Sequence, residues 1–335
     1  MKEAGVWVLA WRRFRRDRLG VASLVVVLIF AAMMVAAASG LIVGDWGEEA
    51  GVSFAPPTFL GPEAESSQLV RAAQDAGPRD DYGIPDPLAA DLADIAKSLS
   101  GSASGGEAHA LTLPLGGDKW GRDVLKKAVK GTQTSLSIGL AAAAFAALIG
   151  TFFGALAGYL GGKIYDFFNW LYSVFTAIPY LLLVLAIAAV VNSKGVLPVI
   201  LILGLTGWTG TYRLVRAEYL KHASREYVRA AHAIGASHVS RIFVHILPNV
   251  SHVILVQLSL LVVAFIKAEV ILSFLGLGVP IELVSWGTML GEAQNELIIG
   301  KWWQLAAATA FMAVFVTAFS LLTDALRDAL DPKLR

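Results

Sequence analysis

The chain has 335 residues, of which 56% are hydrophobic and only 16% are charged, and its mean hydropathy is +0.64. A soluble globular domain of this length carries more polar surface, so the composition indicates an integral membrane protein. The net charge of +1 gives no field that would favour nucleic acid, and the lack of cysteine excludes disulfides, thiolate catalysis and cysteine-ligated metals.

Six segments are apolar and long enough to cross a hydrocarbon layer of about 30 Å at about 1.5 Å per residue. Lipid offers no partners to unpaired backbone groups, so we expect each segment to be helical and the fold to be an all-α, polytopic membrane protein. The predicted spans are residues 21–43, 135–158, 170–192, 196–214, 251–273 and 303–323.

A basic cluster within residues 1–20 stands directly before the first span, and the positive-inside rule keeps such a cluster in the cytoplasm. Its members are Arg12, Arg13, Arg15, Arg16 and Arg18. Six spans then return the C-terminus to the cytoplasm. A cleaved signal peptide is the alternative, because "AAASG" at 36–40 resembles a cleavage site, but the apolar run is longer than such peptides carry.

Residues 44–113 differ in composition from the rest, since acidic residues outnumber basic ones and prolines are frequent. Asp86 as N-cap and Pro87 at the first helical position predict a helix there, and "GSASGGE" at 101–107 is typical of a flexible linker. This extracytoplasmic insertion is either a solvated segment with one packed helix or a docking surface for an external partner.

The longest cytoplasmic loop, residues 215–250, contains "EYVRAAHAIGASHVSRIFVHILPN". Apolar or small residues recur at helical spacing from Glu226, and Gly235 then predicts a left-handed cap. A second short helix should run from Ser237 to His245, and Pro248 should end it before the next span. The loop is therefore expected to be a rigid helix, glycine turn and helix.

Three functions compete for this loop. A DNA-reading helix-turn-helix is disfavoured, because Arg241 replaces an expected apolar anchor and both ends are tethered to the membrane. A metal site is disfavoured because the histidines are spaced across a glycine turn and a proline, without carboxylates; these are His232, His238, His245 and His252. Mechanical contact with a cytoplasmic protein is the third function.

The same stretch resembles the EAA signature of ABC-importer permeases, EAA-x3-G-x9-I-x-LP. Matching positions are Ala230, Ala231, Gly235, Leu247 and Pro248. Arg229 replaces the glutamate and His245 the isoleucine, and these departures match the dipeptide/oligopeptide/nickel permeases, whose version looks like "EYVxAAxxxGAS…HILPN". Similar segments occur at 114–139, 158–183, 268–290 and 326–335, so the resemblance covers most of the chain outside 44–113.

The resemblance implies a permease core at 114–335 with five spans, whose loop forms coupling helices seated on a cytoplasmic ATPase subunit. It assigns this coupling to Glu226, Tyr227, Arg229, Ala230, Ala231, Gly235, Ala236, Leu247 and Pro248. It also implies a homologous second permease subunit, two ATPases that use ATP and Mg²⁺, and an extracytoplasmic solute-binding protein. The expected location is the inner (plasma) membrane.

The chain itself is not expected to be an enzyme or to bind a cofactor. Gly162–Lys163 and Gly300–Lys301 lack the other residues of a phosphate loop, and no catalytic pairing is evident. The alternative function, an ion-coupled secondary transporter, predicts mid-span carboxylates and inverted repeats, and neither is apparent.

Two ionisable residues, Lys267 and Glu269, lie near one end of the fifth span and are candidates for the pathway or a subunit interface. They are two residues apart and should face different sides of the helix. Gly276 and Gly278 should end this span in a tight turn. We expect Trp286, Trp302 and Trp303 to form an aromatic belt at the outer interface.

Overall fold

A computed structural model describes residue 11 and residues 13–62 and 109–330. The chain divides into two compact units, one made of residues 1–44 with 126–335 and the other of residues 45–125. The predicted helix at Asp86 and the linker at 101–107 lie outside the described residues.

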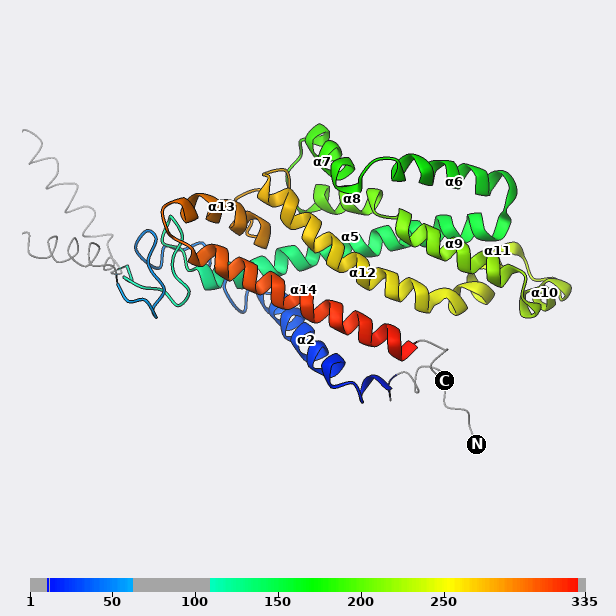
Figure 1. Ribbon diagram of the computed structural model, residues 1–335, viewed down its shortest axis with the longest axis horizontal. Coiled ribbons are helices and arrows are strands. Elements are labelled where there is room, and N and C mark those ends of the chain that lie inside the picture. The colour runs from blue at the N-terminus through cyan, green and yellow to red at the C-terminus, as the bar shows by residue number, and fades with distance from the viewer. Residues whose placement is uncertain (1–10, 12, 63–108, 331–335) are drawn as a thin grey trace, which may run out of the picture. The chain divides into compact units, whose positions relative to one another are not determined.

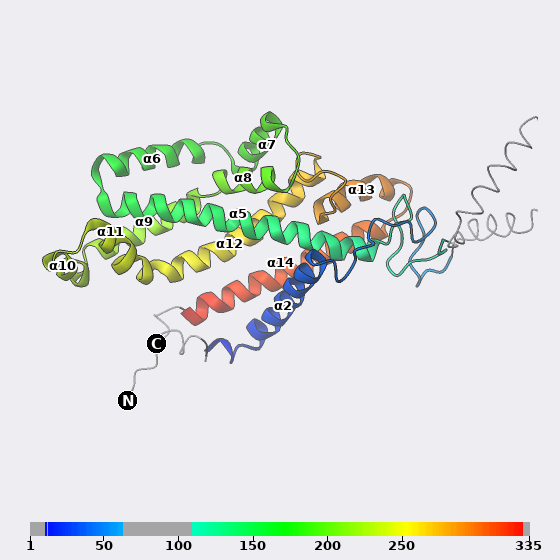
Figure 2. The same cartoon turned by 180° about the vertical axis from the view of Figure 1, so that it is seen from behind.

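The larger unit is built from helices (Figures 1 and 2). In chain order they are α2 (Arg18–Ala38), α5 (Val124–Leu160), α6 (Gly162–Thr176), α7 (Tyr180–Val191), α8 (Val196–Thr206), α9 (Thr209–Ala223), α10 (Glu226–Ala233), α11 (His238–Ser240), the π-helical η1 (Arg241–Ile246), α12 (Leu247–Phe274), α13 (Trp286–Ile298) and α14 (Trp303–Leu330). Helices α2 and α14 lie side by side, and α12 contacts α9, α13 and α14.

Four of these helical segments meet the length and composition of a membrane span: Arg18–Ala38, Val124–Leu160, His238–Phe274 and Trp303–Ala329. A fifth is obtained if the bent pair α6 and α7 counts as one span. The all-α, polytopic class is therefore confirmed, while the number of six spans and their orientation stay predictions. At 37 residues, α5 is about 55 Å long and exceeds the hydrocarbon thickness.

The predicted uninterrupted span at 170–192 is wrong, because α6 and α7 meet at an angle of 85°. Pro179 is the N-cap of α7 and has no N–H for the helical ladder. Its ring also disfavours helical geometry at the preceding residue, Ile178. The hydrophobic run concealed this break, since apolar composition continues across it.

The predicted fourth span, 196–214, is divided between α8 and α9. Helix α8 has only 11 residues, and the ladder is interrupted at Gly207 and Trp208. Helix α9 then continues past the predicted end to Ala223.

Helix α9 packs directly on the backbone of α5 through three glycines at four-residue spacing. A Cβ on Gly150 would lie 2.6 Å from the carbonyl oxygen of Trp208, and one on Gly158 would lie 2.6 Å from that of Arg216. Between them, a Cβ on Gly154 would lie 2.9 Å from the carbonyl oxygen of Tyr212. Small residues at this spacing let two helical backbones approach without an intervening layer of side chains.

Pro248 does not end a helix, which corrects that prediction. The chain runs from α11 through η1 into α12 without interruption, and Pro248 occupies the first turn of α12. The preceding turn is π-helical, and the Leu247 N–H donates to the carbonyl of Ile242, five residues back. This wider turn accommodates a residue that lacks an N–H and whose ring crowds the α-helical carbonyl.

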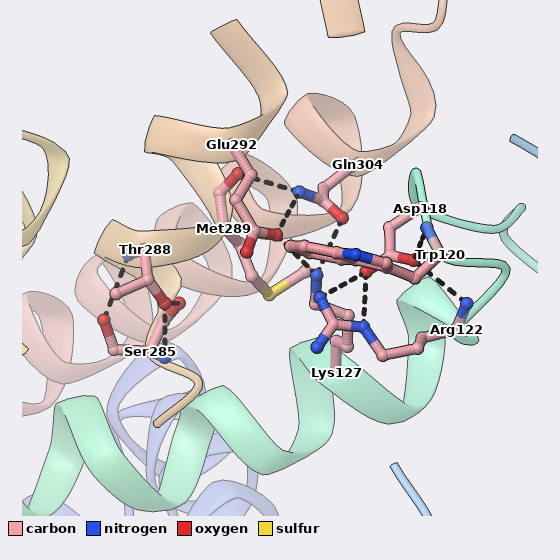
Figure 3. A network of polar contacts seen from close by, with 9 residues as sticks. All are labelled: Asp118, Trp120, Arg122, Lys127, Ser285, Thr288, Met289, Glu292 and Gln304. Carbon is pink, nitrogen blue, oxygen red and sulfur yellow. Dashed lines mark hydrogen bonds and ion pairs between the residues drawn. The ribbon is translucent and has the colours of Figure 1, made fainter. Parts of the chain in front are cut away.

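The described part of the smaller unit has isolated bridges instead of strands, including Gly51 with Ala110 and Gly117 with Asp123. Asp118 organises its last turn (Figure 3): its Oδ1 accepts from the backbone N–H groups of Trp120 and Arg122, and its Oδ2 accepts from Arg122 Nε at 2.7 Å. The Arg122 guanidinium also lies 4.1 Å from the centre of a Trp120 ring.

Substitution of Gly158 tests the α5–α9 contact. We expect Gly158→Ala to lower the stability by about 1–3 kcal/mol, because its Cβ would overlap Arg216 and Tyr219 backbone and side-chain atoms. Gly291→Ala in α13 is the control, since its Cβ would meet nothing closer than 3.4 Å and helical Gly→Ala is neutral to stabilising. Thermal unfolding in one detergent compares them; equal midpoints would contradict the close contact.

Candidate functional site: the coupling segment and its anchor

The loop between α9 and α12 is a compact helix–turn–helix, here called the coupling segment (residues 224–246). Helix α10 begins after extended Arg225 and ends at Ala233; Ile234 is its C-cap, and Gly235, whose φ is +85°, follows. The Gly235 N–H donates to the carbonyl of His232 and the Ala236 N–H to that of Ala231, both at 3.0 Å. This pair of bonds is a Schellman motif, so the predicted left-handed cap is confirmed.

The next helix starts at once. Ser237 is its N-cap, and its hydroxyl accepts from the Ser240 N–H at 3.2 Å. Only Gly235 and Ala236 separate the Ile234 C-cap from this N-cap. The two helices are therefore joined by a turn whose backbone bonds are satisfied, which makes the segment rigid.

One face of the coupling segment is buried against the rest of the larger unit. Val228 of α10 packs with Ile242 and Ile246 of η1, and with Tyr219 of α9. The Tyr219 hydroxyl donates to the carbonyl of Ile242 at 3.1 Å. Helix α9 is thereby fixed both to α5 and to the coupling segment.

The opposite face exposes large apolar side chains. Ile234 is 84% exposed, Val239 66% and Val244 64%. Both overall views place α10 at the end of the helical layer, beyond the end of α12 (Figures 1 and 2). An apolar tip on a rigid, polar projection is typical of a surface that contacts another protein.

A buried carboxyl lies at the other end of α12. Glu269 has no exposed surface; its Oε2 accepts from Ser135 Oγ at 2.9 Å and its Oε1 from Ser273 Oγ at 2.8 Å. Each serine oxygen accepts a backbone N–H in turn, from Trp286 and from Val279 respectively. The chain of bonds links α5, α12 and the start of α13. Lys267, two residues earlier, is exposed.

The turn after α12 is as predicted for one of its two glycines. Gly276 has φ +75° and forms a second Schellman motif, with Leu277 N–H donating to the carbonyl of Leu272. Gly278 has no positive φ; it is needed for close approach, since a Cβ there would lie 2.6 Å from the Ser273 backbone nitrogen.

Trp286 does not join an aromatic belt, which corrects that prediction. It is fully buried, its Nε1 donates to the carbonyl of Ala128, and its ring lies 6.2 Å from that of Phe30. Trp303 is also buried, at 5% exposure, whereas Trp302 is 43% exposed. A tryptophan near the end of a span lies at the membrane interface only if no neighbouring helix covers it. Here α13 folds back onto α5 and α14, and this packing buries Trp286.

Sequence reasoning missed a second polar cluster, which joins α5, α13 and α14. Lys127, 1% exposed, donates to Glu292 Oε2 at 2.6 Å and to Gln304 Oε1 at 3.2 Å. Gln304 Nε2 donates to Glu292 as well, and Figure 3 shows the three side chains pointing toward one another. Glu292 and Gln304 are more than 160 residues from Lys127 in the sequence, so no local sequence pattern predicts that they contact it.

Comparison with known families decides the classification. A model described as "Binding-protein-dependent transport system inner membrane component" matches residues 150–335, and one for the "N-terminal TM domain of oligopeptide transport permease C" matches residues 5–46. The chain belongs to this family of inner-membrane transport components. It is thus a multi-pass inner-membrane permease, as the sequence predicted.

Curated relatives agree with this assignment. The permease is 40% identical to the dipeptide transport system permease protein DppC of Bacillus subtilis over 66% of this chain and 69% of that protein. It is 38% identical to the oligopeptide transport system permease protein OppC of the same species, over 66% of this chain and 72% of that protein. It is 35% identical to the di/tripeptide transport system permease protein DppC of Pseudomonas aeruginosa, over 69% of this chain and 75% of that protein.

The predicted coupling residues of the permease lie in the coupling segment and, for Leu247 and Pro248, in the first turn of α12, and they differ in exposure. Ala231 is buried, and Ala236 and Leu247 are half-buried. The exposed ones are Glu226, Tyr227, Arg229, Ala230, Gly235 and Pro248. The Tyr227 hydroxyl lies 2.8 Å from His222 Nδ1, and burial lowers the pKa of His222. The coupling function of these residues stays a prediction.

Gly235 gives a test of the turn. We expect Gly235→Asn to be tolerated and Gly235→Val to weaken the α10 cap by about 1–2 kcal/mol, because a branched residue is strained at positive φ. No atom lies within 4 Å of a Cβ there, so crowding plays no part. Amide hydrogen exchange of α10 in the purified permease should be about tenfold faster for valine; equal rates would contradict the cap.

Ser273 gives a test of the carboxyl centre. We expect Ser273→Ala to lower stability by about 1–3 kcal/mol, because it leaves a buried N–H of Val279 without its acceptor and removes a donor to Glu269. Ser259→Ala is the matched control: this exposed hydroxyl bonds only the carbonyl of Leu255 within its own helix. Thermal unfolding in detergent should separate the two, and similar losses would refute the importance of the centre.

Proposed function

We propose that the permease is one of two homologous membrane subunits of an ATP-driven ABC importer for peptides or related solutes: dipeptides, oligopeptides or a nickel chelate. The coupling segment seats on a cytoplasmic ATPase subunit, and a second such pair completes the complex. The family match and the relatives, whose names specify dipeptide, oligopeptide and di/tripeptide transport, support this proposal.

The observation that carries the mechanism is the rigid coupling segment with an exposed apolar tip. Helix α9 connects the segment to the backbone of α5, and η1 continues directly into α12. A force applied at Ile234 therefore reaches two long apolar helices without crossing a flexible joint. Closure of the ATPases around ATP and Mg²⁺ would tilt these helices, and the chain itself would need neither nucleotide nor cofactor.

The topology belongs to the same proposal. Six spans with both termini inside would place the coupling segment and the basic cluster before α2 in the cytoplasm. An extracytoplasmic solute-binding protein would deliver the peptide from the opposite side, where residues 44–113 would lie. Lys267, exposed near the end of α12, remains the better candidate of the two charged residues for the pathway or the second permease subunit.

Uptake by the reconstituted complex tests the function. The permease is purified from its native membrane with associated subunits, placed in proteoliposomes, and supplied with a labelled dipeptide and the binding protein. We expect ATPase subunits to co-purify, uptake to require ATP, and Gly235→Pro to abolish uptake while leaving ATP hydrolysis. Uptake driven by an ion gradient with the ATPases absent would instead establish the alternative, a secondary transporter.

The apolar tip gives a quantitative prediction. We expect Ile234→Ser to weaken ATPase association about tenfold, because the interface loses roughly 1.5 kcal/mol of apolar burial. Leu41→Ser is the control: Leu41 is similarly exposed, at 82%, but lies after α2, outside the coupling segment. Retention of ATPase subunits during a dilution series measures both, and equal retention would show that the tip is not the docking surface.

A further inference from the structure

A small basic pocket lies beside the coupling segment, in addition to its apolar tip. Its volume is about 320 Å³, and it is lined by residues of α5, α9, α10 and η1. Tyr159 closes the α5 side, Arg229 and His232 come from α10, and Arg241 comes from η1. No aspartate or glutamate contributes to this lining.

Arg241 is the unusual member of the pocket. It is only 7% exposed, and its buried Nε has no hydrogen-bond partner. Its Nη2 donates to His238 Nδ1 at 3.3 Å, and its guanidinium lies 5.6 Å from the ring of Tyr159. Among the described residues no carboxylate pairs with this guanidinium, and an unpaired buried charge is costly, so a counter-charge from a partner would stabilise it.

The pocket is suited to one carboxylate. A guanidinium presents N–H donors in a planar fork that fits two carboxylate oxygens, and Arg229, an exposed residue of the lining, adds a second guanidinium. The pocket lies on the coupling segment, between the side of α10 and η1, and Ile234 beside it is 84% exposed. A protein that covers the apolar tip therefore passes over the basic pocket as well.

We propose that this pocket receives an aspartate or glutamate side chain of the ATPase subunit, which forms an ion pair with Arg229 and Arg241. The inference rests on the proposed function, because it requires that a cytoplasmic ATPase covers the coupling segment. The ion pair fixes the orientation of α10 in the docking groove, whereas the apolar tip supplies contact area. It also supplies the missing partner for Arg241 in the assembled complex.

Crosslinking identifies the occupant. The chain has no cysteine, so Ala233→Cys in the pocket and Ile234→Cys at the tip each introduce a unique thiol. Each thiol carries a benzophenone-maleimide crosslinker in the complex purified from native membranes, and mass spectrometry identifies the product. We expect the Ala233→Cys variant to crosslink an ATPase peptide containing aspartate or glutamate. An ATPase product from the tip variant without one from the pocket variant overturns the pocket proposal alone; loss of both overturns the proposed function.

Charge removal tests the ion pair. Arg229→Gln and Arg241→Gln should each weaken ATPase association about thirtyfold, as for loss of one partner in a desolvated ion pair. Arg225→Gln is the matched control, an arginine of the same segment that does not line the pocket. If Arg241→Gln alters folding, Arg229→Gln still tests the ion pair, because Arg229 is exposed and its substitution leaves the fold intact.

A lipid headgroup is the competing occupant. Native mass spectrometry of the permease in nanodiscs containing phosphatidylglycerol measures lipid retention by the same variants. Unchanged ATPase association together with reduced phosphatidylglycerol retention would overturn the proposal in favour of a lipid site. Weakened ATPase association with unchanged lipid retention would support it.

Discussion

The architecture of the larger unit depends on the contact between the backbones of α5 and α9. Three glycines on α5 replace the layer of side chains that normally separates two helices, and carbonyl groups of α9 and of its N-cap Trp208 occupy the space. Packed interiors deform little, so a displacement of α9 is passed to α5 instead of being absorbed by rotamer changes. Since α9 leads directly into α10, this contact determines how firmly the coupling segment is held.

The second anchor is polar and lies near the far end of the same helices. Glu269 and its two serines tie α12 to α5 and to the start of α13, while Lys127, Glu292 and Gln304 tie α5 to α13 and α14. Glycine contacts hold α5 near the coupling segment, and these buried bonds hold it near α13. The helices between the two anchors are thereby joined to one another at both ends.

Local chemistry was predictable from the sequence, and long-range packing was not. The turns at Gly235 and Gly276 could be predicted, because a left-handed helix cap usually requires a glycine directly after the helical pattern of apolar residues. The two prolines were misjudged in opposite ways. Pro179 breaks an apolar run that was predicted to be one continuous span. Pro248 was predicted to end a helix, but it lies in a continuous one because a π-helical turn precedes it.

Burial accounts for the remaining error near the candidate site. Trp286 was predicted to lie at the outer interface, yet this chain encloses it fully. Glu269 is enclosed as well, and its place at the pathway or at a subunit interface stays a prediction. Their enclosure comes from α13, which folds back against α5, and from Ser135, more than 130 residues away. A single sequence carries no signal for such pairings, whereas the repeated glycines of α5 are visible in it.

The π-helical turn has a consequence for how this chain could change. An α-helix advances by about 100° per residue, so the one extra residue of a wide turn rotates everything before it by that amount relative to everything after. The direction in which the coupling segment faces around the helix axis therefore differs from the one that a continuous α-helix with α12 would give it. Deletion of a single residue within 241–246 would restore ordinary helical winding and rotate the coupling segment by about 100° about the helix axis relative to α12.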